Sequence, residues 1–497
     1  MKKMNLLAMS LVSAAALSFS SCSSNDDLAG GGTQSQADGV YMTLKISGAT
    51  SHGTRTSVTD GKTTTDNGSV AESTITEGMM YIYDGTTCVF RKVITQDMFE
   101  TAPTQTKAGV TKPIKVAVTG AITTGKQYDV YFLANNTSVT DPIAATSFFT
   151  STTGGADFAT DNKFVMFNQN DGTKAAAHSK VEFTNDAKSE ATPARAGEIK
   201  LDRVVARIDK PSFAETVTTV TPATETKTSI NAADVVASIS YEGYAVSNLN
   251  NNSYVKQNWD NNFETLTVKW GEPKYSLPKS DYGTLYKADG LANFDTNEKP
   301  VSWKYAFENT TTDVNDATAV YFKVKATLKE AANNTSDFRD GTFYRYDGRL
   351  YTSIQAIYND AATGAISNPF TETNSIKPAD VVAKISDTDG KLTTDEGVLA
   401  KFRQDYKIEV YRQGVMYYRW AISDNAYKPF VGSETTHTYS VLRNSIYRLT
   451  VTKVSEIGKD VPNGPEPDDP VKNPNFYMNV TVSINPWVLN AQPIELK

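Results

Sequence analysis

An uninterrupted alternation of apolar and more polar residues near the C-terminus is the feature that most limits the fold. Every second residue of the segment 476–484 is apolar, namely Phe476, Met478, Val480, Val482 and Ile484. A β-strand points successive side chains to opposite faces, so this spacing predicts a strand with one apolar face. The same alternation occurs near the N-terminus at Val40, Met42, Leu44 and Ile46. The chain therefore favours a β-sheet protein.

A proline-rich segment, residues 462–475, leads into the C-terminal strand. Its prolines are Pro462, Pro465, Pro467, Pro470 and Pro474. Proline lacks a backbone donor and favours an extended chain, so this segment forms neither a helix nor a central strand. At about 3 Å per residue it reaches roughly 40 Å. We interpret residues 462–497 as an arm that carries a donor strand into the sheet of a neighbouring subunit. The alternative is an ordinary last strand after a long loop.

The rest of the chain repeats the β pattern. Strand-like segments flank Asp84-Gly85, Asp347-Gly348 and Gln413-Gly414, which predicts three hairpins. Further strands are expected at 114–118, 128–134, 201–208, 235–244, 319–328, 439–442 and 447–454, and short helices at 142–149, 353–360 and 378–385. A Thr-, Ser- and Ala-rich stretch begins at 211, so we expect two antiparallel β-sandwich-like domains, residues 56–211 and 212–461.

The first residues form a targeting segment. Lys2 and Lys3 precede an apolar stretch, 6–19, that is too short to span a bilayer, so residues 1–21 are expected to be a signal peptide. Phe19-Ser20-Ser21-Cys22 resembles a bacterial lipobox, which predicts lipidation of Cys22. The alternative is an ordinary secretory signal that is cut nearby.

A Gly-, Thr- and Ser-rich stretch, 47–71, follows the first strand and is long for a structureless loop. Its only arginine is Arg55. Such a loop suits a protease, so we predict cleavage between Arg55 and Thr56. Residues 22–55 would then be a lipidated propeptide that contains a removable strand.

The composition offers little for catalysis. The formal net charge is −7 and the pI is near 5.3, which disfavours a nucleic-acid partner. Two cysteines and three scattered histidines cannot build a disulfide framework or a Cys/His zinc site, so we expect no metal, no cofactor and no enzyme. Asp387-Thr388-Asp389-Gly390 has the wrong glycine spacing for an EF-hand loop, and we interpret it as a solvated turn. Cys88 is interpreted as a buried small hydrophobe, and Arg203 as a solvated or locally paired charge. The sequence leaves open whether the fold brings two carboxylates together as a catalytic pair.

Several segments together resemble a Bacteroidetes fimbrilin, nearest the Mfa-like major subunits of type V pili. These are the Cys22 lipobox, the Val40–Ile46 strand with Arg55 behind it, and the segments 201–208, 417–420, 441–447 and 482–487. The resemblance implies a transthyretin-like sandwich fold and a lipoprotein precursor at the outer membrane, from which an arginine-specific protease removes the N-terminal strand. The C-terminal strand of another subunit then fills the groove, which builds a head-to-tail homopolymer at the cell surface for adhesion and biofilm formation. Accessory anchor and tip subunits and host or bacterial surface receptors are the further partners it implies.

A cleavable strand together with a donor arm favours a stalk subunit over a tip or an anchor. Two other functions stay open. The many Tyr and Trp residues would suit a surface glycan-binding lipoprotein, and a secreted hydrolase of unrecognised type is the third candidate.

Overall fold

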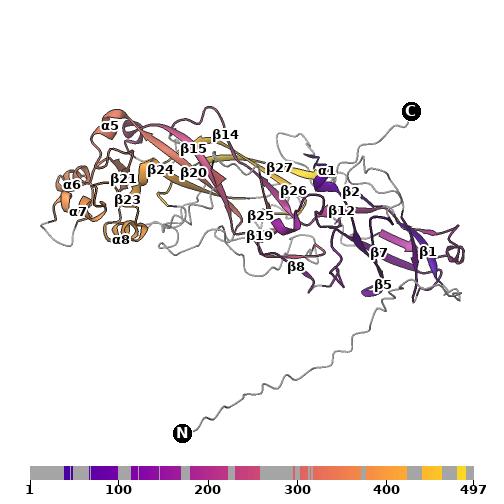
Figure 1. Ribbon diagram of the computed structural model, residues 1–497. Helices are drawn as coiled ribbons and strands as arrows, with labels where there is room; N and C mark the ends of the chain where they lie inside the picture. The colour runs from indigo at the N-terminus through magenta and orange to yellow at the C-terminus, as the bar shows by residue number, and fades with distance from the viewer. Residues whose placement is uncertain are drawn as a thin grey trace, which may run out of the picture.

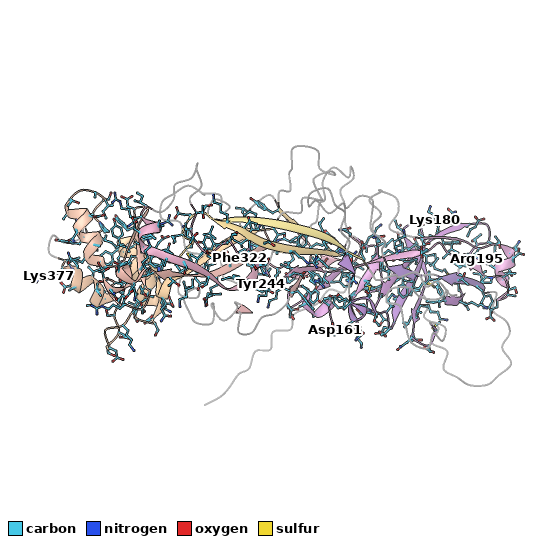
Figure 2. The ribbon with its side chains drawn as sticks, turned by 90° about the horizontal axis from the view of Figure 1, so that it is seen from above. Asp161, Lys180, Arg195, Tyr244, Phe322 and Lys377 are labelled. Atoms are coloured by element: carbon cyan, nitrogen blue, oxygen red, sulfur yellow. The ribbon has the colours of Figure 1, made fainter. Side chains whose placement is uncertain are left out.

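The computed structural model describes residues 39–44, 46–48, 66–67, 69–98, 114–120, 122–144, 146–169, 179–221, 230–257, 295–296, 303–311, 314, 317–370, 376–422, 439–461 and 478–488. The molecule is elongated (Figure 1), with an N-terminal group of strands at one end, a group of helices at the other and long strands between. Figure 2 shows the same axis from above, with Lys180 and Arg195 at one end and Lys377 at the other.

Two sheets enclose the first core. One has the strand order β2-β12-β9-β7-β4-β5 with β10 paired to β7, and the other has the order β11-β1-β6. Both contribute side chains to one buried cluster, which makes this unit a β-sandwich. Its strands are β1 (Val40–Leu44), β2 (Ile46–Gly48), β4 (Gly78–Asp84), β5 (Thr87–Ile94), β6 (Ile114–Val118), β7 (Gln127–Ala134), β9 (Met166–Asn168), β10 (Ser179–Glu182), β11 (Ala194–Arg195) and β12 (Ile199–Arg203).

A second core lies between a six-stranded sheet and a four-stranded sheet. The six-stranded sheet has the order β18-β13-β26-β27-β3 with β14 paired to β26, and the four-stranded sheet has the order β17-β15-β20-β24. The strands are β3 (Asp66–Asn67), β13 (Ala206–Asp209), β14 (Ser212–Phe213), β15 (Val236–Ser247), β17 (Asp295–Thr296), β18 (Trp303–Ala306), β20 (Ala319–Leu328), β24 (Val415–Ala421), β26 (Ser445–Val454) and β27 (Met478–Val488). Two strand pairs complete this part, β8 (Phe148–Thr150) with β16 (Asn252–Tyr254) and β19 (Asn309–Thr311) with β25 (Tyr439–Val441).

The helices at the far end belong to an insertion, residues 330–411, between the paired strands β20 and β24. It has its own buried cluster and a three-stranded sheet, β22-β21-β23. Its helices begin at recognisable caps, because Ser353 and Asp395 accept hydrogen bonds from the first helical turn and Pro378 occupies a first-turn position. The elements are α5 (Glu330–Asn334), β21 (Phe343–Tyr346), β22 (Arg349–Tyr351), α6 (Ile354–Ala362), α7 (Pro378–Lys384), α8 (Glu396–Tyr406) and β23 (Glu409–Tyr411), and the remaining short turns are α1 (Val70–Ser73), α2 (Ala232–Val235), η1 (Ala156–Phe158), η2 (Asn185–Lys188) and η3 (Arg412–Gly414).

The predicted mostly-β fold with sandwich-like sheets and a few short helices is confirmed. Two of the three predicted hairpins are also present, β4–β5 around Asp84-Gly85 and β21–β22 around Asp347-Gly348. The third is wrong. Gln413 and Gly414 do turn the chain with positive φ, but β23 pairs with β21 while β24 pairs with β20, so the turn joins two different sheets.

Two further expectations need correction. Residues 142–149 form no helix, because Phe148 and Phe149 belong to β8 and pair with β16. The expected strand 201–208 is two strands, and the chain passes from the first sandwich to the second at Val204 and Val205. These two side chains belong to the first core and Ala206 to the second, a few residues before the expected domain boundary near 211.

Candidate functional site

The N-terminal strand β1 lies between two other strands. It pairs antiparallel with β6, where Met42 faces Val116, and parallel with β11, where Met42 faces Ala194. Both of its edges are therefore hydrogen-bonded to strands distant in sequence. Without β1, β6 and β11 would each present an unpaired edge.

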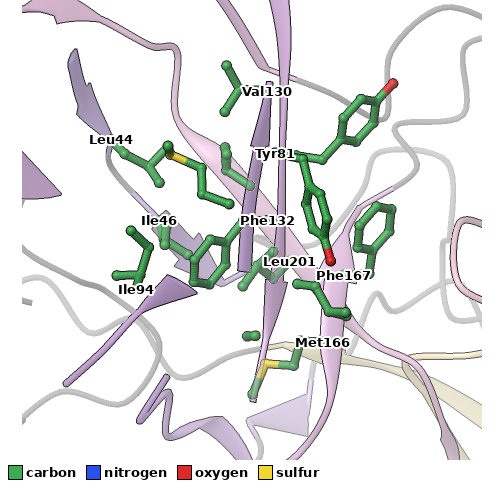
Figure 3. Close-up of a cluster of buried hydrophobic side chains, with 14 of the residues drawn as sticks. Leu44, Ile46, Tyr81, Ile94, Val130, Phe132, Met166, Phe167 and Leu201 are labelled. Atoms are coloured by element: carbon green, nitrogen blue, oxygen red, sulfur yellow. The ribbon is translucent and has the colours of Figure 1, made fainter. Parts of the chain in front are cut away.

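The strand that we predict to be removable also fills the core of the first sandwich. Val40 is 4% exposed, and Met42, Leu44 and Ile46 are fully buried. Figure 3 shows Leu44 and Ile46 in the same apolar cluster as Phe132 and Ile94. Ile46 begins β2, which pairs with β12 in the other sheet, so this short segment contributes to both sheets. Burying four such side chains stabilises the fold by about 6–12 kcal/mol, at roughly 1.5–3 kcal/mol each.

The C-terminal strand β27 lies in the six-stranded sheet of its own chain. It pairs antiparallel with β26 from Ser445↔Pro486 to Val454↔Met478, and parallel with β3, where Trp487 faces Asp66. The strand continues through Pro486 to Val488. In the single chain this segment thus occupies the place of an ordinary last strand, and a donor role requires that it leaves β26 and β3.

A buried arginine links the two sandwiches. The Arg203 side chain at the end of β12 is fully buried, and it donates to the Glu72 carbonyl oxygen (2.9 Å), to Ser73 Oγ (2.9 Å) and to Asn444 Oδ1 (3.2 Å). Burial lowers the pKa of Arg203 to about 9, which leaves it charged at neutral pH. Our interpretation of Arg203 as a solvated or locally paired charge is therefore wrong, because its partners lie more than a hundred residues away in sequence.

A second buried arginine, Arg443, reinforces this junction. Its Nε donates to Glu308 Oε2 at 2.7 Å, and its guanidinium also donates to the carbonyl oxygens of Val255 (2.9 Å) and Tyr254 (2.7 Å). Arg443 and Glu308 are 2% and 1% exposed. A buried ion pair with several further hydrogen bonds resists separation, because removing one partner leaves an uncompensated charge.

Two further features that the sequence analysis singled out are described, Cys88 and the turn at Asp387. Cys88 on β5 is half-buried rather than buried, and its Sγ lies 3.5 Å from the Phe90 carbonyl oxygen. The Asp387 carboxylate accepts hydrogen bonds from the amides of Asp389 (2.9 Å) and Lys391 (2.8 Å), which closes a turn. Within the described ranges no group of His, Cys, Asp or Glu is arranged to hold a metal ion, and no helix has the length and apolar character to cross a membrane.

Comparison with known proteins identifies the C-terminal part. Residues 409–493 match the family model described as "Major fimbrial subunit protein type IV, Fimbrillin, C-terminal". The resemblance to the fimbrilins is confirmed. The fimbrillin match begins at β23 and takes in β24, β25, β26 and β27, together with the proline-rich arm.

Solved structures of similar proteins come from Porphyromonas gingivalis and Parabacteroides distasonis. A fimbrilin (fimA) from Porphyromonas gingivalis is 15% identical and has a TM-score of 0.40, with 91% of this chain and 99% of that chain covered. A putative cell adhesion protein from Parabacteroides distasonis is 13% identical with a TM-score of 0.42, over 92% and 99% of the two chains. The tip fimbrial protein Mfa3 from Porphyromonas gingivalis is 12% identical with a TM-score of 0.31, over 90% and 100%. No curated protein matches the chain. The identification as a relative of fimbrial subunits rests on the fimbrillin match.

The predicted fimbrillin sites divide into two groups. Cys22, Arg55, Thr56 and Phe476 lie outside the described residues. The removable strand and most of the donor strand are described, as β1 with Ile46 of β2 and as β27. They do not contact each other in a shared sheet of one chain, because β1 is in the sheet with β6 and β27 is in the sheet with β26.

Sequence reasoning missed the junction arginines as structural centres. Arg443 and Asn444 were noted only as part of a fimbrilin-like segment. Glu308, the partner of Arg443, and Glu72, the partner of Arg203, stand in unremarkable surroundings. An arginine embedded in an apolar run, as in the strand around Arg203, is the one available signal, since a charge among buried residues needs specific partners.

Proposed function

We propose that the chain is a stalk subunit of a surface fimbrium and polymerises head to tail by donor-strand exchange. In this scheme the strand at 476–484 of one subunit takes the place of β1 in the next, with Met478, Val480, Val482 and Ile484 entering the groove. The observation that carries the proposal is the position of β1, which is paired on both edges and buries one apolar face. The C-terminal strand has the same alternation of apolar residues, so its side chains suit the same pockets.

Maturation would proceed in three steps. Cys22 is lipidated and holds the precursor at the outer membrane, an arginine-specific protease cuts between Arg55 and Thr56, and the propeptide 22–55 leaves with β1 and β2. Arg55 stands between β2 and β3, so this cut leaves both strands whole and keeps β3 on the mature chain. Exposing the groove only after export prevents premature polymerisation, because an unpaired edge readily recruits other strands.

The intramolecular place of β27 fits this scheme as a storage position. The ladder with β26 pairs one edge of the donor strand from Met478 to Pro486 until a groove becomes available, and β3 pairs the other edge at Trp487 and Val488. Transfer then replaces the hydrogen-bond ladder with β26 by a ladder in the groove of the next subunit. Burial of apolar side chains in the pockets left by β1 supplies the favourable free energy. The mature subunit, residues 56–211 and 212–461 with the arm 462–497, would act as structural material without cofactor or catalysis. Partners would be further copies, anchor and tip subunits and surface receptors in adhesion and biofilm formation.

A test in trans separates binding from folding. A subunit that lacks residues 1–55 and 476–497 is mixed with a synthetic peptide of residues 476–497. Removing 476–497 also vacates the place beside β26, so the readout is the first sandwich, and we expect the peptide to raise its thermal midpoint. A peptide with Val482→Asp should bind far more weakly than one with Thr481→Asp, because the two positions lie on opposite faces of the strand.

The same experiment can defeat the proposal. A folded subunit that ignores the wild-type peptide, or surface fibres that assemble from a chain lacking residues 476–497, would mean that β27 serves only its own sheet. Sequencing the first residues of isolated fibre subunits checks the processing step, for which a chain that retains Val40–Ile46 would be the contrary result.

A further inference from the structure

The segment that leads from β26 to the proline-rich arm is buried although it belongs to no strand. This segment, which we call the arm root, comprises Ser455–Val461. Ser455, Glu456 and Ile457 are 2%, 3% and 0% exposed, and Asp460 and Val461 are 8% and 4% exposed. Chain segments outside regular structure usually run over the surface, so the burial of this one needs a specific cause.

The insertion supplies part of that cause. The Asp460 carboxylate accepts hydrogen bonds from Arg403 Nε of α8 and from the Val410 amide of β23, the latter at 2.8 Å. The Tyr411 hydroxyl donates to the Gly458 carbonyl oxygen at 2.7 Å. Three side-chain or backbone groups of the insertion thus hold the arm root from one side.

Strand β24 holds the arm root from the other side. The amide of Tyr417 donates to the Lys459 carbonyl oxygen at 2.7 Å, and the amide of Lys459 donates back to Tyr417 at 2.8 Å. The Tyr418 hydroxyl donates to the Glu456 carbonyl oxygen at 2.8 Å. A Cβ at Gly458 would lie 2.6 Å from the Tyr417 carbonyl oxygen, so only glycine fits where the two segments approach.

The position of these contacts determines at which end of the molecule the arm starts. The helices of the insertion, α8 among them, form the end of the molecule opposite the first sandwich, as Figures 1 and 2 show. The arm root is bonded to α8 and β23, so the arm starts at the end of the subunit far from its own N-terminal groove.

We propose that the insertion 330–411 is an anchor for the donor arm, with Asp460 as its main positioning residue. It fixes the point from which the arm leaves, so that β27 can detach from β26 while the chain up to Val461 stays in place. The partner that this end faces in the fibre is the N-terminal sandwich of a second copy. This inference rests on the proposed donor-strand transfer, and it assigns the insertion a role in setting the geometry between neighbouring subunits.

Hydrogen exchange on the single chain tests the anchor directly. In Asp460→Ala, which removes the acceptor of the Val410 amide, we expect exchange of the Val410 and Lys459 amides to accelerate at least tenfold. Leu399→Ala is the matched control, because it creates a cavity on the same helix, α8, within the insertion's own buried cluster, to which no arm-root residue belongs. If Asp460 only stabilised the fold, Asp460→Ala would accelerate amide exchange over the whole insertion, as we expect of Leu399→Ala. That result would overturn the proposal.

Fibre geometry provides the second measurement. Fibres of Asp460→Ala should bend more, with a persistence length in electron micrographs at least twofold shorter than that of wild type and of Leu399→Ala. Wild-type fibres and Asp460→Ala fibres of equal stiffness would overturn the anchor and leave donor-strand exchange intact. Failure of every variant, wild type included, to polymerise would instead defeat the proposed function, while the exchange data would still decide whether the arm root is anchored.

Discussion

Cutting the loop after β2 should not by itself release the N-terminal strand. Val40, Met42, Leu44 and Ile46 are almost or fully buried, and β1 also makes ladders with β6 and β11. The apolar contribution alone is about 6–12 kcal/mol, an upper bound because the freed strand buries some surface of its own. We therefore expect the cleaved fragment to stay bound until a competing strand displaces it.

Leu44→Ala tests this reasoning quantitatively. Removing a fully buried leucine side chain costs about 2–5 kcal/mol, which corresponds to roughly 30-fold to several thousand-fold weaker retention of the fragment. Thr43→Ala is the matched control on the opposite face of β1. Its hydroxyl makes one long hydrogen bond, 3.4 Å to the Ala194 carbonyl oxygen, so its loss should change retention by less than tenfold.

The assay uses a protease site introduced into the loop 49–65 and a fluorophore on the N-terminal fragment. The cut protein is isolated by size exclusion, and release is followed after excess peptide 476–497 is added. Equal retention of the Leu44→Ala and Thr43→Ala fragments would refute the packing argument. Complete loss of the wild-type fragment before the peptide is added would refute the claim that contacts alone hold β1.

Three further predictions concern stability. Glu308→Gln should lower the free energy of unfolding by about 3–5 kcal/mol in urea titrations, because it leaves the buried Arg443 charge without its partner. The double variant with Arg443→Met should lose less stability than the two single variants lose together. Burial raises the pKa of Glu396, so the folded state holds the carboxyl proton more tightly than the unfolded state does. The free energy of unfolding should therefore decline as the pH rises from the ordinary glutamate range through the raised pKa. Glu396→Gln should flatten that part of a plot of thermal midpoint against pH. Gly85→Ala, at φ +61, should lower the free energy of unfolding by about 1–2 kcal/mol, the cost of the left-handed backbone alone. Gly414→Ala should prevent stable packing, because its Cβ would lie 2.0 Å from a carbonyl oxygen of β20. Equal thermal midpoints of the two variants would contradict this comparison.

Local patterns predicted the elements whose structure depends on near neighbours. Period-two alternation identified β1 and β6, and Asp-Gly pairs identified two hairpins, since these turns need residues that accept positive φ. The helix α8 was missed although its buried residues Leu399, Phe402 and Tyr406 are spaced for one helix face and Asp395 caps its start. That signal was present in the sequence.

The candidate site was predicted only in its parts. The alternation at Val40–Ile46 and at Met478–Ile484 could be read directly, since a strand face is a local property of the chain. The partners of these strands could not, because β6 and β11 approach β1 from distant parts of the sequence and no side-chain pattern states which backbone edge a strand will meet. The same holds for the placement of β27 on β26.

The sequence by itself determined that the chain forms half-buried strands and where most of its turns lie. Only the tertiary structure decided which strand is central and which charges are buried. Gln413-Gly414 turns the chain as its composition demands, yet the fold of the insertion sends the flanking strands to different sheets. Arg203 is charged in any environment near neutral pH, but whether water or the Glu72 carbonyl solvates it depends on contacts that form only when distant segments pack together.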